Sequence, residues 1–379
     1  MPWKAASAMS LRLEFVRLAM TGSANIRSLC RRYEISPKTA YKWIDRYREG
    51  GAEGLGDRSR RPHHSPVQTA RGIEHAIVHL REKHPSWGAR KLHRRLVVQG
   101  YHALPSVSTI TAILHRHGCI NPIDTQKHQP CQRFEAAEPN LLWQMDFKGD
   151  FPLLHGRCYP LTILDDHSRF SLGLVACSNQ RRETVQQHLV TTFRRYGLPQ
   201  RILTDNGGPW GSCGNDAYTE LAAWMIRLGI GLSHSRVCHP QTLGKDERFH
   251  RTLHAEVIAT SFFESTDHCQ HSFDHWRTVY NFERPHEALA MAVPASRYHP
   301  SPREYPETLP RIEYSPNDIV RKVQGKGEIS FGGREFKIGK AFQGYNVALR
   351  PTTVDSVLNV FFCHEQIAQI NLNNDIQSS

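Results

Sequence analysis

Three separated carboxylates, each inside a distinctive run of residues, are the side chains of this sequence best suited to chemistry. Asp146 lies in Trp143-Gln-Met-Asp-Phe-Lys148, Asp205 lies in Leu203-Thr-Asp-Asn-Gly-Gly208, and Glu247 lies in His239-Pro-Gln-Thr-Leu-Gly-Lys-Asp-Glu-Arg-Phe-His250. Magnesium prefers hard oxygen ligands and usually takes only one or two carboxylates per ion. Three acids that converge from distant positions could therefore hold a pair of metal ions of the kind that serves phosphoryl transfer.

The neighbours of each acid predict the element that positions it. Apolar and polar residues alternate around Asp146, which is typical of a strand with Asp146 on its polar face. The short run Arg201-Ile-Leu-Thr204 stops at a cluster of turn-forming residues, so Asp205 is predicted at the end of a strand, where open α/β sheets bind ligands. Glu247 belongs to the first turns of a helix, because the apolar residues after it recur at helical spacing: Phe249, Leu253 and Val257.

Taken singly, an Asp after a strand is most often a turn or cap residue, and a Glu in the first turn of a helix is most often a partner of the helix dipole. The sequences that flank them are more specific, and they resemble the integrase-type transposases of bacterial insertion sequences, whose ribonuclease H-like catalytic core is shared with retroviral integrases. The resemblance continues in Tyr280-Asn-Phe-Glu-Arg-Pro-His-Glu-Ala-Leu289 and Pro294-Ala-Ser-Arg-Tyr298, and it covers most of the chain. It implies that Asp146, Asp205 and Glu247 are the catalytic residues and the ligands of two magnesium ions, for which manganese could substitute.

The chain departs from the pattern of that family at two places. The stretch between Asp205 and Glu247 is longer than usual, and Cys213 to Leu232 contains the extra length, which we interpret as a loop insertion. Asp246 stands where the family usually has an apolar residue, so it is a rival for the third ligand. Helical residues step by about 100°, so both acids cannot face one metal. Asp246 falls on the apolar stripe, where it could cap the helix or favour its positive end, and Glu247 falls on the polar side and is predicted to face the site.

Two other groups of residues could be mistaken for parts of a site. Asp165 and Asp166 are adjacent in a predicted strand, so they point to opposite faces and are interpreted as the end of a hairpin. The run His268-Cys-Gln-His271 has no second ligand pair, so it is better explained as a helix surface than as a zinc site.

Length and composition limit the class of protein. A chain of 379 residues can form two to four domains with buried cores. The longest apolar runs are too short to cross a membrane and no leader peptide opens the sequence, so we expect a soluble cytoplasmic protein that associates with the bacterial nucleoid when it binds DNA. The nine cysteines include no CxxC pair, so neither a disulfide framework nor a zinc site is expected.

Positive charge is concentrated at the start of the chain. Residues 1–134 contain 23 Lys and Arg against 9 Asp and Glu, a net charge of +14, whereas the remainder has a net charge of −2. Such asymmetry favours a nucleic acid partner, although solvated surface charge alone could explain a smaller excess.

The basic first third is predicted to contain two helical DNA-binding modules. In residues 1–55, a helix over Asn25–Glu34 and a second over Pro37–Tyr47, capped by Ser36, form a helix-turn-helix pattern, with an ordinary helical hairpin as the alternative. The second helix would present its outward polar residues to DNA: Lys38, Thr39, Lys42 and Arg46. Residues 56–70 form a basic linker whose arginines either follow the DNA backbone or are merely solvated: Arg58, Arg60 and Arg61.

A second helix-turn-helix-like domain is predicted over residues 71–120. Its sequences Trp87-Gly-Ala-Arg-Lys-Leu-His93 and Pro105-Ser-Val-Ser-Thr-Ile-Thr-Ala-Ile-Leu-His115 resemble the second such module of the same family, with Ser106 or Ser108 as a helix cap. Its basic residues are candidates for phosphate contacts, of which the first two are preferred: Arg90, Lys91, Arg94 and Arg95.

The rest of the chain is predicted to contain the core and a tail. After a linker over residues 121–138, residues 139–300 alternate strands and helices, as expected of a mixed α/β sheet flanked by helices. Residues 310–379 contain a tight hairpin at Gly325 to Lys337 and further strands from Val347 to Asn371, which predict a small C-terminal β-barrel.

Together these features predict a transposase that binds the terminal inverted repeats of an insertion sequence, cleaves the DNA and transfers the strand. Its partners would be double-stranded DNA, both element ends and target, and further copies of itself in a dimer or larger assembly on paired ends. Three basic residues near Glu247 could contact phosphates at the scissile bond, namely Lys245, Arg248 and Arg251, although Arg251 could instead pair with Glu247 across one helical turn. The alternatives are a DNA-binding regulator without catalysis and a nuclease that cuts without joining.

Overall fold

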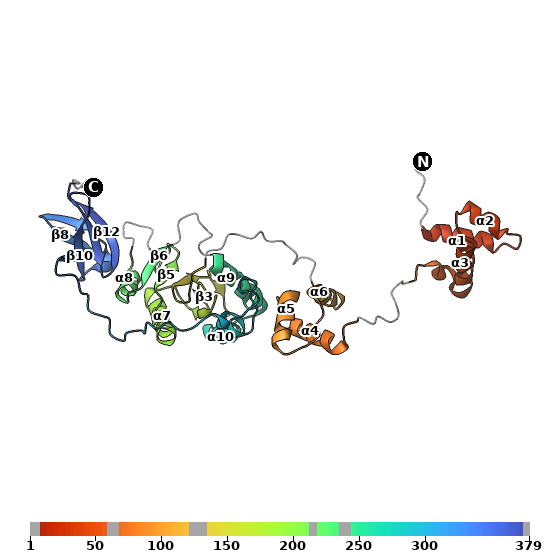
Figure 1. The fold of residues 1–379 in the computed structure, drawn as a ribbon, viewed down its shortest axis with the longest axis horizontal. Helices are drawn as coiled ribbons and strands as arrows, with labels where there is room; N and C mark the ends of the chain where they lie inside the picture. Colours follow the sequence, from red (N-terminus) through yellow and green to blue (C-terminus); the bar gives the residue numbers. More distant parts are fainter. Residues whose placement is uncertain (1–7, 59–67, 121–134, 212–217, 235–243, 374–379) are drawn as a thin grey trace. The chain divides into compact units, whose positions relative to one another are not determined.

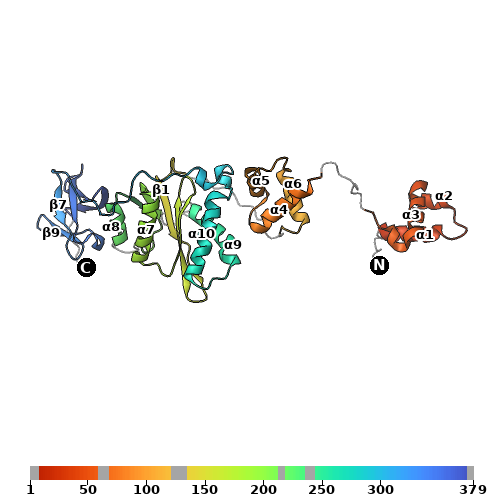
Figure 2. The same ribbon diagram turned by 90° about the horizontal axis from the view of Figure 1, so that it is seen from below.

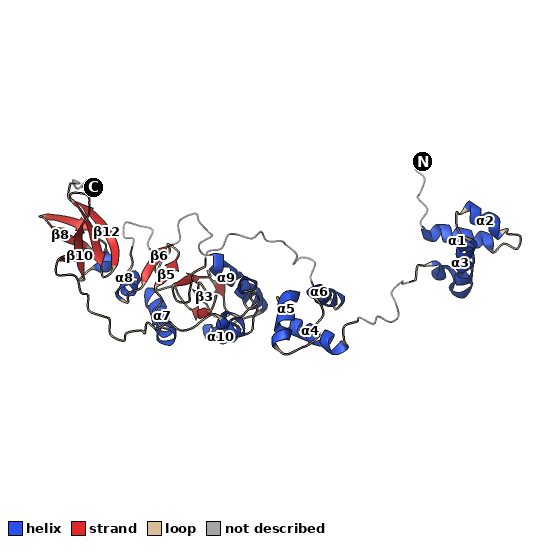
Figure 3. Ribbon diagram, viewed as in Figure 1, coloured by secondary structure: helices blue, strands red, loops and turns tan. Residues whose placement is uncertain are grey.

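The computed structural model describes residues 8–58, 68–120, 135–211, 218–234 and 244–373, and it divides the chain into the compact units Met1–Gln68 and Thr69–Ser379. Helices make up the first part of the chain, strands and helices alternate in the middle, and strands make up the end (Figure 3). No helix among the described residues is both long and apolar enough to cross a membrane.

The first unit is a three-helix domain (Figure 1). It contains α1 (Ala8–Ala19), α2 (Ile26–Arg32) and α3 (Pro37–Gly50), followed by a 3-10 turn at Gly51–Leu55. The Ser36 side chain accepts a hydrogen bond from the Thr39 amide at 3.2 Å, so the predicted cap of α3 is confirmed. On the other side of α3 from the polar residues, Ala40, Trp43 and Ile44 are buried in one cluster with Phe15, and Tyr47 is half-buried against it.

Three more helices open the second unit, namely α4 (Arg71–Lys83), α5 (Ala89–Val98) and α6 (Val107–Arg116). Of the two predicted caps of α6, Ser106 is the one observed, since its hydroxyl accepts from the Thr109 amide. Apolar residues of all three helices pack together, and Val279 from the α/β part of the unit joins this cluster.

A mixed sheet lies at the centre of the second unit. Its strands are β1 (Leu142–Phe147), β2 (Phe151–Pro152), β3 (Arg157–Asp165), β4 (Ser171–Cys177), β5 (Arg201–Thr204) and β6 (Gly231–His234). The order is β2-β3-β1-β5-β6, with β4 also paired to β3. The β1–β3 and β3–β4 pairs are antiparallel, whereas the β1–β5 and β5–β6 pairs are parallel.

Helices cover both faces of this sheet, as Figure 2 shows. Residues of α7 (Arg182–Tyr196) and α8 (Glu220–Arg227) pack against Trp143 and Met145 of β1. Residues of α9 (Gly244–Glu256) and α10 (Thr266–Phe282) pack on the opposite face, against Leu164 and Leu174. The predicted α/β layers are therefore confirmed. The described part of the stretch interpreted as a loop insertion contains α8 and the start of β6, so it is not simply a loop.

The tail contains β7 (Ile319–Lys322), β8 (Glu328–Phe331), β9 (Arg334–Lys337), β10 (Asn346–Pro351), β11 (Val357–Phe362) and β12 (Glu365–Asn371). The hairpin predicted from Gly325 to Lys337 is confirmed as β8-β9, and the two glycines of its turn, Gly332 and Gly333, adopt positive φ. The predicted closed barrel is not found, because the described strands form this hairpin and a separate sheet of order β12-β11-β10-β7. A barrel requires the two edge strands of a sheet to pair, and no pairing of β7 with β12 is found among the described strands.

Candidate active site

Asp146 lies on β1, and its neighbours connect it to the helix that carries the third acid. Its register partner on β3 is Thr162, whose hydroxyl donates to the Asp146 carbonyl at 3.0 Å. The same hydroxyl lies 2.8 Å from Nε2 of His250 on α9. Burial lowers the pKa of His250 to about 4, so its ring is neutral and Nε2–H can donate to Thr162. These contacts place α9 over β1 and β3.

Asp205 follows the last residue of β5, as its turn-forming neighbours predict. Leu203 on β5 pairs with Gln144 on β1 in parallel register, so two residues further along Asp205 comes beside Asp146. One Asp205 carboxylate oxygen accepts hydrogen bonds from the Gly207 amide at 3.1 Å and from the Trp210 indole. The two acids that were predicted on separate strands therefore end up at neighbouring positions of the sheet.

The electrostatics of Asp146 show that the acids influence one another. Burial, together with the negative charges of Asp205 and then Glu247, raises the pKa of Asp146 to about 7, while a hydrogen bond from the Phe147 amide opposes the shift. A divalent cation neutralises negative charges that are held close together, and carboxylate oxygens are the donors that magnesium prefers. The chemistry of these side chains thus fits a metal site.

Helix α9 places its two neighbouring acids on opposite sides. Asp246 is fully buried with Phe249 and Leu253, whereas Glu247 is exposed, so the predicted apolar and polar sides of α9 are confirmed; that Glu247 faces the site stays a prediction. Neither carboxylate oxygen of Asp246 has a hydrogen-bond partner, which rules out the predicted capping role. Burial raises the pKa of Asp246 well above its ordinary value, and the charges of Asp146 and Asp166 add to this effect.

The three described acids do not form a ready set of metal ligands. Among the described residues, no group of three or more His, Cys, Asp and Glu side chains is arranged to hold a metal ion. Residues 235–243, which lead into α9, lie outside the described part. The structure therefore brings Asp146 and Asp205 together, and it places Glu247 on the exposed side of α9, close enough for its charge to act on Asp146.

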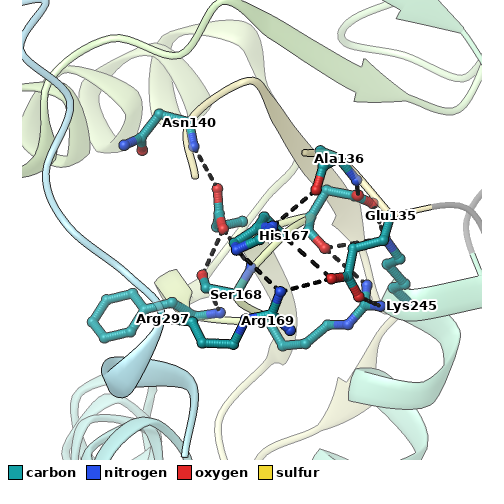
Figure 4. A network of polar contacts seen from close by, with 11 residues as sticks. Glu135, Ala136, Asn140, His167, Ser168, Arg169, Lys245 and Arg297 are labelled. Atoms are coloured by element: carbon teal, nitrogen blue, oxygen red, sulfur yellow. Dashed lines mark hydrogen bonds and ion pairs between the residues drawn. The ribbon is translucent and has the colours of Figure 1, made fainter. Parts of the chain in front are cut away.

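The competing acids Asp165 and Asp166 belong to a buried polar network around the turn after β3 (Figure 4). Asp165 accepts hydrogen bonds from the amides of Asn140 and Ser168, at 2.8 and 2.7 Å. Asp166 accepts from the Ala136 amide and the Gln144 side chain, both at 2.7 Å. Both acids thus have structural partners at the end of a hairpin, as predicted.

Of the three basic residues near Glu247, only Lys245 is drawn inward. Its ammonium forms an ion pair with the Asp166 carboxylate and donates to the Asp166 carbonyl at 3.0 Å. Arg248 and Arg251 are exposed on the outer side of α9. No ion pair joins Arg251 to Glu247 among the described residues.

The predicted DNA-contacting residues of α3 lie at its surface to different extents. Lys38 and Lys42 are exposed, while Thr39 and Arg46 are half-buried, and the guanidinium of Arg46 lies 5.0 Å from the Trp43 ring centre. Arg58 is exposed and lies 3.6 Å from Glu49. Arg60 and Arg61 are outside the described residues.

Helix α5 directs much of its basic side toward the α/β part of the same unit. Arg95 forms a 2.6 Å ion pair with Glu283, and Arg90 lies 3.6 Å from Glu287. Burial, together with the positive charge of Arg284, lowers the pKa of Lys91 to about 8. Arg94, by contrast, is exposed. The sequence showed the charges of α5 but not these acidic partners, which follow almost 200 residues later.

Models of known families match most parts of the chain. An integrase core domain matches residues 136–240, and a second integrase core model matches residues 228–294. A helix-turn-helix domain matches residues 11–63, and a homeodomain-like domain matches residues 39–114. The C-terminal domain of the IS481 family transposases matches residues 318–377.

Curated relatives come from insertion elements. An uncharacterized 31.7 kDa protein of insertion element IS407 from Burkholderia multivorans is 26% identical over 238 residues, which cover 62% of this chain and 81% of the relative. An uncharacterized 39.2 kDa protein of insertion element IS476 from Xanthomonas euvesicatoria is 25% identical over 242 residues, which cover 61% of this chain and 66% of the relative.

Solved structures of viral integrases are more distantly similar. The HTLV-2 integrase catalytic core domain in complex with magnesium is 15% identical, with a TM-score of 0.35, and the match covers 44% of this chain and all of that one. A chain of the simian T-cell lymphotropic virus intasome in complex with PP2A regulatory subunit B56 gamma is 16% identical, with a TM-score of 0.37, and the match covers 78% of this chain and 98% of that one. Likeness at this level supports no conclusion about the site.

Helix-turn-helix domains beside an integrase core, with two acids on adjoining strands of its sheet, define a class of proteins that process DNA. The chain combines helix-turn-helix domains with an integrase core, its C-terminal part is similar to that of the IS481 family transposases, and its curated relatives are proteins of insertion elements.

Proposed function

We propose that this protein binds the terminal inverted repeats of its own insertion sequence, cleaves the DNA there and joins the cut ends to a target. The observation that carries the proposal is the pair Asp146 and Asp205 at neighbouring positions of parallel strands, where burial and mutual repulsion raise the pKa of Asp146 to about 7. A carboxylate kept in such a position is destabilised unless a cation accompanies it.

In this proposal Asp146, Asp205 and Glu247 hold two magnesium ions, for which manganese can substitute. Bound there, the ions would supply Lewis acidity to the attacking and the leaving oxygen. The protein's own residues orient the acids: Trp210 and Gly207 hold Asp205, and Thr162 connects the backbone of Asp146 to His250 of α9. The exposed residues Arg248 and Arg251 would contact phosphates beside the scissile bond.

We propose the following organisation for recognition, cleavage and assembly: residues 1–55 and 71–120 bind DNA, 56–70 and 121–138 link the domains, 139–300 catalyse, and 310–379 form the tail. The protein would act as a dimer or larger assembly on paired ends, in the bacterial cytoplasm where the chromosome lies. Base reading by α3 is supported by the exposed Lys38 and Lys42 beside a buried Trp43.

The decisive experiment incubates purified protein with labelled element ends, a second DNA and magnesium. Asp146→Asn and Asp205→Asn should each abolish cleavage and joining while end binding continues, because losing a needed ligand costs several kcal/mol of barrier, or more than about a hundredfold in rate. Asp150→Asn is the matched control, since Asp150 follows β1 and forms an exposed ion pair with Arg157 at the start of β3. Cleavage without joining would indicate a nuclease, and end binding without either reaction would indicate a regulator.

A gel-shift measurement at fixed salt tests recognition. The first unit alone should prefer element ends over random duplex, and Lys38→Ala combined with Lys42→Ala should erase this preference. Arg48→Ala is the control, because Arg48 lies at the end of α3 beside Asp45. Equal affinity of the unsubstituted unit for both DNAs would assign sequence reading to α4–α6 instead.

A further inference from the structure

The contact between Lys245 and Asp166 is the most enclosed ion pair near the proposed site. Asp166 has a fully buried side chain, and that of Lys245 is 16% exposed. The ammonium reaches both the carboxylate and the main-chain carbonyl of Asp166, which lies 79 residues earlier in the chain. Breaking a buried pair of this kind by removing one partner is costly, because the other charge is left without compensation.

Asp166 is held from other directions as well. The Ala136 amide and the Gln144 side chain both donate to its carboxylate at 2.7 Å, and Arg169 donates to its carbonyl at 2.9 Å. Arg169 in turn pairs with Glu135 at 3.3 Å. The turn after β3 is therefore a fixed point, and Lys245 attaches the start of α9 to it (Figure 4).

This fixed point connects two of the proposed catalytic acids. Gln144 precedes Asp146 by two residues on β1, so their side chains share one face of the sheet. Lys245 precedes Glu247 by two residues in the first turn of α9. One chain of contacts, Gln144 to Asp166 to Lys245, therefore joins the strand that carries Asp146 to the helical turn that carries Glu247.

We propose that Lys245 and Asp166 form a clamp that positions the first turn of α9, so that Glu247 is held at a fixed distance from Asp146. Lys245 is then a positioning residue, and it does not contact DNA phosphates. This inference rests on the proposed function, because it assigns the clamp to the site of Asp146 and Glu247. The burial that lowers the pKa of Lys245 to about 8 agrees with an ammonium that lies inside the protein.

Three variants of the full chain separate positioning from phosphate contact. Lys245→Met keeps the apolar stem and removes the charge, whereas Lys245→Arg keeps the charge. Arg251→Met is the matched control, because it removes a charge from the exposed side of the same helix. Urea unfolding of each variant establishes that it is folded before comparison.

The first measurement is the Mn²⁺ concentration that gives half-maximal joining. Lys245→Met should raise this concentration by about 10- to 100-fold, with much of the rate recovered at saturating Mn²⁺, and Lys245→Arg should restore most of the affinity for Mn²⁺.

The second measurement is the slope of end-binding affinity against salt concentration. Lys245→Met should leave this slope unchanged, whereas Arg251→Met should reduce it by about one and leave the Mn²⁺ requirement unchanged.

The third measurement requires no activity. Amide hydrogen exchange in peptides covering Gly244–Glu256 should be faster in Lys245→Met and in Asp166→Asn than in the unsubstituted protein. A reduced salt slope for Lys245→Met, with unchanged exchange and Mn²⁺ requirement, would show that Lys245 contacts phosphate and would overturn the clamp. Unchanged values in all three measurements would overturn it too. If the variants exchange faster but the unsubstituted protein neither cleaves nor joins DNA, the clamp is retained and the proposed function is rejected.

Discussion

Asp246 places a carboxylate in the protein interior where neither oxygen has a hydrogen-bond partner. The negative charges of Asp146 and Asp166 act on it, so burial and repulsion both oppose its ionisation. A buried polar group without partners costs free energy whether or not the protein is active. Substitution of Asp246 therefore tests whether this residue only destabilises the fold or is needed for catalysis.

Replacing Asp246 should improve stability and spare activity. We expect Asp246→Val to raise the free energy of unfolding in urea by about 1–3 kcal/mol at neutral pH, because the unpaired carboxyl is replaced by an apolar group of similar size. Asp246→Asn should keep most of the strand transfer, whereas Glu247→Gln should abolish it. If both Asp246 variants are folded and bind ends but cannot join them, Asp246 and not Glu247 is the third ligand.

Asp146 should make stability depend on pH when metal is absent. Its pKa is about 7 in the folded protein and near 3.8 ordinarily, so the folded state holds this proton more tightly than the unfolded state. The resulting stabilisation is complete below about pH 4 and is lost as the pH rises through about 7. Asp146→Asn cannot titrate. In EDTA, the free energy of unfolding of Asp146→Asn minus that of the unsubstituted protein should therefore increase between these pH values, by up to about 4 kcal/mol.

Urea unfolding at several pH values measures this difference. Asp150→Asn serves as the control, because Asp150 is paired with Arg157 at the surface of the same sheet. A difference between Asp146→Asn and the unsubstituted protein that stays constant from about pH 4 to about pH 8 would contradict the raised pKa.

Residue patterns predicted the positions of Asp146 and Asp205 in the sheet because the signals are local. Alternation placed Asp146 on a strand face, and turn-forming residues placed Asp205 at a strand end. The partners of Lys245 could not be predicted in this way, since Asp166 lies 79 residues away and the contact depends on how α9 packs on the sheet. Because this partner is distant in sequence, Lys245 was expected to contact DNA phosphates and not Asp166.

At the scale of elements, α5 distinguishes basic residues that face the protein from those that face solvent. Arg95 pairs with Glu283 and its side chain is only 18% exposed, whereas the adjacent Arg94 is exposed. Glu256 extends this contact region, because it accepts hydrogen bonds from Ser86 and from Arg284 of the α/β part. Contacts of this kind attach α4–α6 to the α/β part of the unit.

Single alanine substitutions of the two neighbours should therefore act differently. Arg94→Ala should reduce the salt dependence of end binding by about one phosphate contact and leave unfolding by urea unchanged. Arg95→Ala should leave the salt slope unchanged and lower the free energy of unfolding by about 1–3 kcal/mol, since Glu283 loses its partner. A reduced salt slope for Arg95→Ala with unchanged stability would show that the Glu283 pair opens to release Arg95 to DNA.

The elements themselves were largely predictable where local chemistry sets their limits. Ser36 and Ser106 cap the helices that their positions predicted, and the glycine pair at Gly332 and Gly333 forms the expected hairpin. Closure of the tail into a barrel was not predictable in the same way, because it requires pairing between strands at opposite edges, β7 and β12. Such pairing depends on sheet curvature and shear, which a strand pattern does not encode.

At the scale of the whole molecule, the proposed reaction requires more than one copy of this chain. Each chain has one Asp146 and one Asp205, and joining two element ends to one target requires a reactive site at each end. Closed symmetric assemblies are the usual way in which identical chains are held together. We therefore expect a dimer or a larger assembly to form when the protein binds paired ends.

Sedimentation velocity with labelled ends measures the size of this assembly, and mixing identifies which copies act. Asp146→Asn should assemble on paired ends like the unsubstituted protein, because the substitution removes a ligand charge and leaves the DNA-binding helices intact. In equal mixtures of the two proteins, paired-end joining should fall to about a quarter, since random dimers contain two intact sites only that often. The opposite result would be joining that falls only to half in the mixture, together with complexes that sediment as one chain bound to both ends. That result would show that a single copy completes the reaction.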